Sequence, residues 1–288
     1  MINMVDNKFI EKNQGSVVVL DLGYNALYAL NAIKRELNNE NIIYLNDLNK
    51  ETYDVLSEEE IFDLNAVLEN IKELIARALK FSPKLIIVAN DSIIEYGKEL
   101  LDAVEVKKIY LTDVIIEEIN KNYEYKNMAF FAPQGIIEAN LYQHNFHYTR
   151  LYNLNADNIL DSLKNFKMKT SDSFNQVKNA LLPLYKKDVD VIIPTFSNIL
   201  LFQTEIFEYV KDQNKDVVIL NIDDLLAKNA KLSIGNVQDA KQKNKKPVFI
   251  VKNKEEINKN KKDLKQALND QKKVYEKVLK IDYRIIYE

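Results

Sequence analysis

The sequence predicts an α/β protein with two doubly wound, parallel-sheet domains. Short apolar runs such as 17–20 and 85–88 have the length and composition of buried strands. Stretches with apolar residues at helical spacing separate these runs, an alternation typical of parallel sheets covered by helices. The chain has 288 residues, which suffices for two domains of ordinary size.

In the first part of the chain, strands are expected at 17–20, 42–45 and 85–88. The stretch 27–37 is expected to be a helix, because its leucines and isoleucine recur on one face. Ser57 is followed by three glutamates, which suit the positive end of a helix that begins there. A helix is also expected at 67–79.

The pattern then restarts. Strands are expected at 108–111, 128–131, 189–193, 217–222 and 248–251, and helices at 136–147, 174–185 and 223–230. No linker rich in Gly, Ser or Pro separates the two parts, so the two domains are expected to share an interface.

The end of the chain is rich in lysine. Residues 255–280 predict an amphipathic helix with an apolar stripe that includes Leu264 and Leu268. The favoured interpretation is a helix packed on the body with its lysines in solvent; the alternative is a docking helix for a partner. The β-prone stretch 281–287 predicts either a last edge strand or an arm that extends another subunit's sheet.

Composition excludes several classes of function. The chain has 40 Lys and Arg against 43 Asp and Glu, so nothing favours nucleic acid or an anionic membrane as a partner. No apolar run reaches the roughly 20 residues that cross a bilayer, and residues 1–14 lack the core of a signal peptide. We therefore expect a cytoplasmic protein. Frequent Asn, Lys, Ile and Tyr, which have AT-rich codons, indicate an AT-rich genome such as that of wall-less bacteria.

The absence of cysteine rules out disulfides and thiolate metal sites. The only histidines, His144 and His147, lie three apart on the predicted 136–147 helix, but no third ligand accompanies them. We expect a surface pair and no metal. The sequence also lacks G-x-G-x-x-G, P-loop and H-E-x-x-H motifs, so no cofactor is expected.

Five segments each include or directly precede a loop at the end of a predicted strand, or follow such a strand, which is where α/β sheets bind ligands. They are 17–27 (VVVLDLGYNAL), 43–54 (IYLND with KETYD), 86–92 (IIVANDS), 135–143 (GIIEANLYQ) and 190–200 (DVIIPTFSNIL). In this order they resemble motifs of the cofactor-independent glutamate racemases, over about residues 16–275. The resemblance implies two pseudo-symmetric domains facing across a cleft. The first would comprise residues 1–97 and 208–288, and the second residues 98–207.

The resemblance places Asn90 and Phe196 where the family has its two catalytic cysteines. Racemisation without a cofactor needs a base on one face of the α-carbon and an acid on the other. The amide of Asn90 is not basic and Phe196 has no exchangeable proton, so this chemistry is expected to be lost. Leu22 and Ile136 also replace hydroxyl residues of the family, and Asp91 would repel an anionic substrate.

Several polar side chains remain in these motifs. They are Asp21, Asp47, Tyr53, Asp91, Ser92, Ser197 and Asn198. The favoured interpretation is that the Asp and Ser residues cap helices after the strands, with Phe196 filling the former pocket as core. The alternative is a remnant ligand cleft, in which Asp21 and Asp91 form a carboxylate pair.

The function expected from these observations is a catalytically inactive racemase-like protein that serves as a structural or interaction subunit of a protein complex. A cytoskeletal or motility assembly of a wall-less bacterium is one conceivable setting, and 255–280 and 281–287 are the candidate docking elements. A homo-oligomer is left open. One alternative is a small-molecule-binding regulator, which requires an open pocket near Asp21, Asp91 and Ser197. Another is an isomerase of the family with changed chemistry, which requires converging carboxylates with a perturbed pKa.

Overall fold

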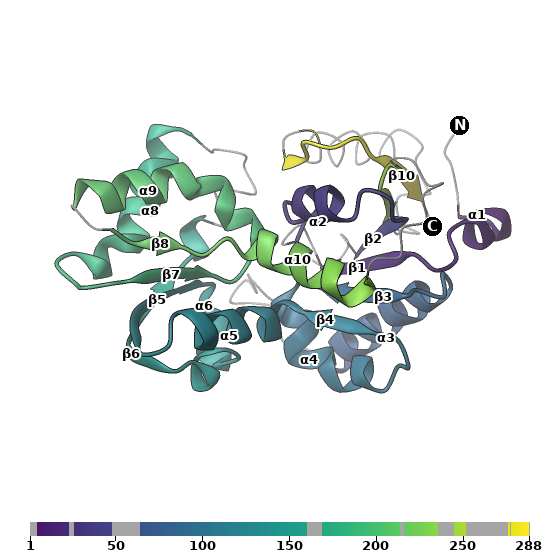
Figure 1. Ribbon diagram of the computed structural model, residues 1–288, viewed down its shortest axis with the longest axis horizontal. Helices are drawn as coiled ribbons and strands as arrows, with labels where there is room; N and C mark the ends of the chain where they lie inside the picture. Colours follow the sequence, from purple (N-terminus) through teal and green to yellow (C-terminus); the bar gives the residue numbers. More distant parts are fainter. Residues whose placement is uncertain are drawn as a thin grey trace.

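The computed structural model describes residues 5–22, 26–47, 64–159, 169–213, 216–235, 245–251, 276 and 278–287. The chain forms two lobes side by side, each built on a parallel sheet with helices packed around it, and the first and last described elements, α1 and β10, both lie in the first lobe (Figure 1). The expected fold class is confirmed. Within the described residues, no helix is both long and apolar enough to cross a membrane.

The sheet of the first lobe has six strands in the order β10-β9-β2-β1-β3-β4, and all neighbouring pairs are parallel. The strands are β1 (Val17–Leu22), β2 (Ile42–Asp47), β3 (Leu85–Val88), β4 (Lys108–Tyr110), β9 (Val248–Val251) and β10 (Arg284–Tyr287). Every residue of β1 and β3 is buried, as expected for central strands covered on both faces. The stretch 281–287 contributes β10, an edge strand beside β9.

Four described helices precede β4. They are α1 (Asn7–Lys12), α2 (Leu30–Glu36), α3 (Leu64–Leu79) and α4 (Asp91–Asp102). The packing of α3 on α4 is close at Gly97, where an added Cβ would lie 2.6 Å from Ile71 Cγ2. The helix expected to begin at Ser57 lies outside the described residues, as does nearly all of the 255–280 helix.

The sheet of the second lobe has four parallel strands in the order β6-β5-β7-β8. The strands are β5 (Lys126–Ala132), β6 (Tyr148–Asn155), β7 (Val191–Pro194) and β8 (Val218–Ile219). The described helices that follow β4 in the chain are α5 (Leu111–Asn122), α6 (Gln134–Ala139), η1 (Gln143–Asn145), α8 (Ser171–Leu181), η2 (Leu182–Leu184), η3 (Ser197–Phe202), α9 (Gln203–Asp212) and α10 (Ile222–Ile234). The order β6-β5-β7-β8 repeats the order β2-β1-β3-β4 of the first sheet, which gives the two lobes a common topology.

The strand order shows where the chain crosses between lobes. Strand β4, which follows the expected boundary at residue 97, still pairs with β3 in the first sheet. Strand β8, which follows the boundary at residue 207, still pairs with β7 in the second sheet. Helix α10 then packs on α2, β3 and β4 of the first lobe, at the junction of the two lobes (Figure 1).

The prediction of a single helix at 136–147 is wrong. Helix α6 ends at Ala139, and Asn140 adopts a left-handed conformation (φ 55°) that asparagine tolerates better than most residues. His144 therefore lies in η1, whereas His147 precedes β6 and pairs with Glu124 at 3.0 Å. The two histidines share no helical face.

Candidate functional site

Asn90 joins two strand ends of the first lobe. It is the N-cap of α4, and its Oδ1 accepts a hydrogen bond from the backbone N–H of Ile93 at 3.1 Å. Its Nδ2 donates to Asp21 Oδ1 and to the carbonyl of Leu22, both at 3.1 Å. The amide therefore fastens the end of β3 to the end of β1. The capping role that we expected of Asp and Ser residues falls here to Asn90.

Asp21 is the centre of a buried hydrogen-bond network. Its carboxylate is 0% exposed and accepts from Tyr44 Oη at 2.5 Å, from the N–H of Ala26 at 2.8 Å and from Asn90. Burial raises the pKa of Asp21 to about 7, although the hydrogen bonds from Tyr44, Ala26 and Asn90 act in the opposite direction. The network connects the end of β1 and the residues after β3 to Tyr44 in the middle of β2.

Asp91 makes a contact between the lobes. It is the first residue of α4, and its carboxylate accepts a hydrogen bond from the hydroxyl of Tyr142, which follows α6 in the second lobe. Both side chains are buried. Burial, together with the negative charge of Asp91, raises the pKa of Tyr142 well above its ordinary value, so the tyrosine stays a donor.

A second contact between the lobes comes from the end of β7. Asn198 Oδ1, in η3, accepts a hydrogen bond from the backbone N–H of Tyr28 at 3.2 Å. The neighbouring Ser197 lies beside Asp223 at the start of α10. Burial raises the pKa of Asp223 to about 7, and the Ser197 hydroxyl acts in the opposite direction.

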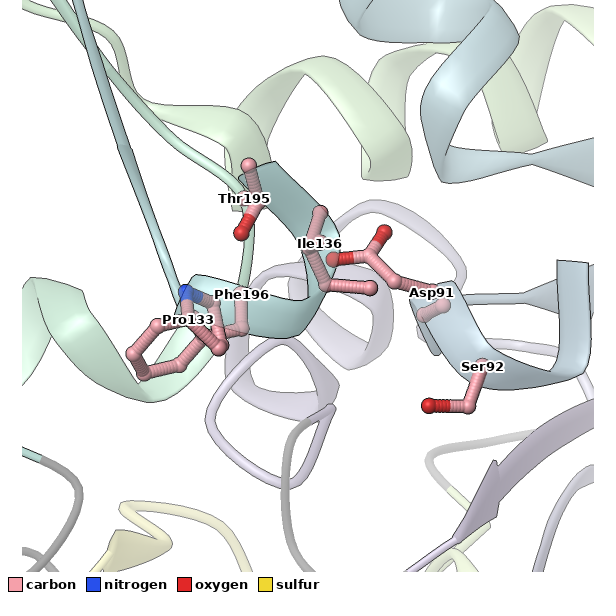
Figure 2. Close-up of a pocket in the computed structure, with 7 residues that line it drawn as sticks. Asp91, Ser92, Pro133, Ile136, Thr195 and Phe196 are labelled. Carbon is pink, nitrogen blue, oxygen red and sulfur yellow. The ribbon is translucent and has the colours of Figure 1, made fainter. Parts of the chain in front are cut away.

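A small cavity lies between these two strand ends. The first lobe contributes Ala89, Asp91 and Ser92, and the second contributes Pro133, Ile136, Thr195 and Phe196 (Figure 2). Its volume is about 10 Å³, near the minimum that can hold one water molecule and far below the roughly 300–1,000 Å³ of small-molecule pockets. Phe196 is 3% exposed and forms part of the wall. A molecule of amino-acid size does not fit in this cavity.

The structure separates some of the residues that the sequence grouped. Asp91 and Ser92 line the cavity, but Asp21 does not, and the two carboxylates have different hydrogen-bond partners. The backbone of Asp47 pairs with Leu22 at the end of β2. Tyr53 lies outside the described residues. In the described part of the chain, no three His, Asp or Glu side chains are grouped as a metal site would require.

Sequence reasoning gave no role to four residues of the site. They are Tyr44, Tyr142, Thr195 and Asp223. Tyr44, Tyr142 and Thr195 belong to three of the five motif segments, and this membership was the one signal that the sequence offered. Their partners lie on other strands or in the other lobe, and no local pattern in a single sequence identifies such contacts.

The structure is similar to solved glutamate racemases. The enzyme from Thermus thermophilus with β-chloro-D-alanine has a TM-score of 0.76 and 14% identity, over 96% of this chain and 97% of that chain. The Francisella tularensis enzyme with D-glutamate has a TM-score of 0.74 and 16% identity, over 95% and 97%. A glutamate racemase isoform from Bacillus anthracis has a TM-score of 0.73 and 20% identity, over 96% of this chain and 97% of that chain. No family model and no curated protein sequence matches the chain. At these identities the likeness is one of fold.

Proposed function

We propose that this chain, which has the glutamate racemase fold, is not a racemase and serves as a structural or interaction subunit of a protein complex. The observation that carries the proposal is the state of the site between the lobes. Side chains fill it down to about 10 Å³, and Asn90, Asp91 and Asn198 form hydrogen bonds within the protein itself.

The first support is chemical. The chain contains no cysteine, and Asn90 and Phe196 stand at the two motif positions where thiols would be expected. The Asn90 amide uses both of its polar atoms in structural hydrogen bonds. The Phe196 ring can neither donate nor accept a proton, so two-sided proton transfer at an α-carbon has no pair of groups to perform it.

The second support is geometric. The hydrogen bonds Tyr142–Asp91 and Tyr28–Asn198 connect the lobes, and Asp91 also lines the cavity. A ligand of amino-acid size would need to displace lining side chains such as Phe196. The same geometry weighs against the small-molecule regulator, which requires an open pocket here.

The changed-chemistry isomerase has one observation in its favour, the raised pKa of Asp21. It also requires Asp21 and Asp91 to converge on a substrate. Asp21 is enclosed by Tyr44, Ala26 and Asn90, and does not line the cavity. We therefore favour the non-catalytic subunit.

The partner is proposed to be a protein that contacts the first lobe near the chain end. Strand β10 is the edge strand of the six-stranded sheet, and an edge can accept a further strand. The other candidate docking element, 255–280, remains a proposal from the sequence. So do the cytoplasmic location and the cytoskeletal or motility setting.

Two measurements test the proposal. The first follows deuterium incorporation at the α-carbon of D- and L-glutamate by proton NMR. A glutamate racemase is the positive control, and the Asn90→Ala variant, purified in the same way, controls for a contaminating racemase. We expect no exchange from the purified chain. Exchange by the wild type that the variant lacks would refute the non-catalytic assignment.

The second measurement is the mass and composition of the native protein isolated from its source cells. A stoichiometric complex with another protein is the expected result. A monomer or homodimer that carries no other protein would contradict the subunit role, whatever the outcome of the exchange assay.

A further inference from the structure

The cavity between the lobes contains a polar group without a partner. Thr195 is 1% exposed, and among the described residues nothing hydrogen-bonds to its Oγ1. This hydroxyl lines the cavity together with Asp91, which is 8% exposed, and Ser92. Buried polar atoms in native proteins are nearly always hydrogen-bonded, and an ordered water is a common partner where no protein atom is near.

The size of the cavity limits the guest. A volume of about 10 Å³ is near the lower limit for one water molecule. The remaining wall is largely apolar, with Pro133, Ile136 and Phe196 from the second lobe (Figure 2). A single small molecule that makes few hydrogen bonds fits this enclosure, and a carboxylate or phosphate group does not.

The charges around the cavity also limit the guest. The Asp91 carboxylate disfavours an anion. The cavity adjoins the first turn of α4, whose positive end disfavours a cation. The hydroxyl of Tyr142 already partly satisfies the carboxylate. A neutral molecule that both donates and accepts meets the needs of Asp91 and Thr195 together.

We propose that this cavity is a binding site for one internal water molecule, hydrogen-bonded to Thr195 Oγ1 and to the Asp91 carboxylate. Because Thr195 and Asp91 belong to different lobes, this water is a third polar link across the junction, beside Tyr142–Asp91 and Tyr28–Asn198. The proposal goes beyond the proposed function and stands or falls independently of whether the chain is catalytic.

Crystal structures of the full chain test this site directly. In the wild type we expect a solvent peak at hydrogen-bonding distance, about 2.6–3.0 Å, from both Thr195 Oγ1 and an Asp91 oxygen. The Thr195→Val variant keeps the shape of the side chain and removes the hydroxyl, so the peak should disappear. Thr195→Ser keeps the hydroxyl and should keep the peak. An empty cavity in the wild type would overturn the proposal, even if the valine variant failed to fold.

Oxygen-17 relaxation dispersion provides the measurement in solution, since it counts water molecules with long residence times. The wild type and Thr195→Ser should each hold one more such water than Thr195→Val. Equal numbers in all three proteins would overturn the proposal. So would a melting temperature of the wild type that rises in ammonium chloride relative to sodium chloride, because the occupant would then be a cation.

Discussion

Replacing Asn90 by alanine tests whether this position is now part of the scaffold. The substitution removes the cap of α4 and two hydrogen bonds, one to the Asp21 carboxylate and one to the Leu22 carbonyl. Loss of a cap costs about 1 kcal/mol. A hydrogen bond to a charged group contributes about 1.5–3 kcal/mol, and a neutral one about 1 kcal/mol. We expect the free energy of unfolding to fall by about 3.5–5 kcal/mol above neutral pH.

The loss should depend on pH with a definite sign. The pKa of Asp21 is raised to about 7, so its carboxyl is protonated in acid and ionised in mild base. The Asn90 amide stabilises the ionised form more than the protonated form. The variant should therefore lose about 1 kcal/mol more stability at about pH 8.5 than at about pH 5.5.

Urea unfolding at both pH values is the assay. The matched control is Asn221→Ala, which removes the exposed cap of α10. Asn221 Oδ1 accepts a hydrogen bond from the N–H of Asp224 at 3.1 Å, and its Nδ2 donates to the Asp224 carboxylate at 2.9 Å. This control should cost about 1 kcal/mol and show little pH dependence. If Asn90→Ala cost no more than Asn221→Ala at either pH, the structural role of Asn90 would be wrong.

Three further predictions concern other parts of the molecule. Burial raises the pKa of Asp223 from 3.8 to about 7, so the stability contributed by the protonated carboxyl is complete below about pH 4 and is lost as the pH rises through about 7. Asp223→Asn should remove this pH dependence, which amounts to at most about 4 kcal/mol, from the free energy of unfolding measured in urea. A profile in the variant as steep as that of the wild type would contradict this prediction. Gly97→Ala should lower the melting temperature and cost about 1–2 kcal/mol of unfolding free energy, because the new Cβ would lie 2.6 Å from Ile71 Cγ2. The control Gly135→Ala should not lower the melting temperature, because its new Cβ would have no atom within 4 Å. Tyr142→Phe should cost about 1.5–3 kcal/mol in urea unfolding, since it removes a donor to a buried carboxylate of the other lobe; a neutral effect would mean that this bond adds nothing.

The sequence predicted the buried strands well because their signal is local. The run 85–88 matches β3 at both ends, and 17–20 and 42–45 fall within β1 and β2. Strand β6 was not predicted. It lies at a sheet edge with most of its residues exposed or partly exposed, so it lacks both a continuous apolar run and a regular alternation.

In the candidate site, too, local features could be predicted from the sequence and contacts between distant segments could not. The resemblance to glutamate racemase motifs identified Asn90 and Phe196 as positions of interest, and each lies two residues after a strand that is recognisable from its own residues. Pairing Asp91 with Tyr142, or Asn198 with Tyr28, depends on how the lobes meet, which the chain specifies only through the whole fold. The alternative interpretation, a carboxylate pair of Asp21 and Asp91, gains no support, because the two carboxylates have different hydrogen-bond partners and only Asp91 lines the cavity.

The position of β9 in the six-stranded sheet has a consequence during synthesis. Strands β1 to β4 are complete by residue 110, so the central part of this sheet can form early. Its neighbour on the β2 side, β9, begins only at residue 248, which is 201 residues after β2 ends at residue 47. At about 5–20 residues per second, the apolar edge of β2 waits roughly 10–40 s for its covering strand. During that interval the nascent chain exposes a β-prone edge of the kind that recruits chaperones or pairs with other chains, so the last strands to be made close the sheet against aggregation.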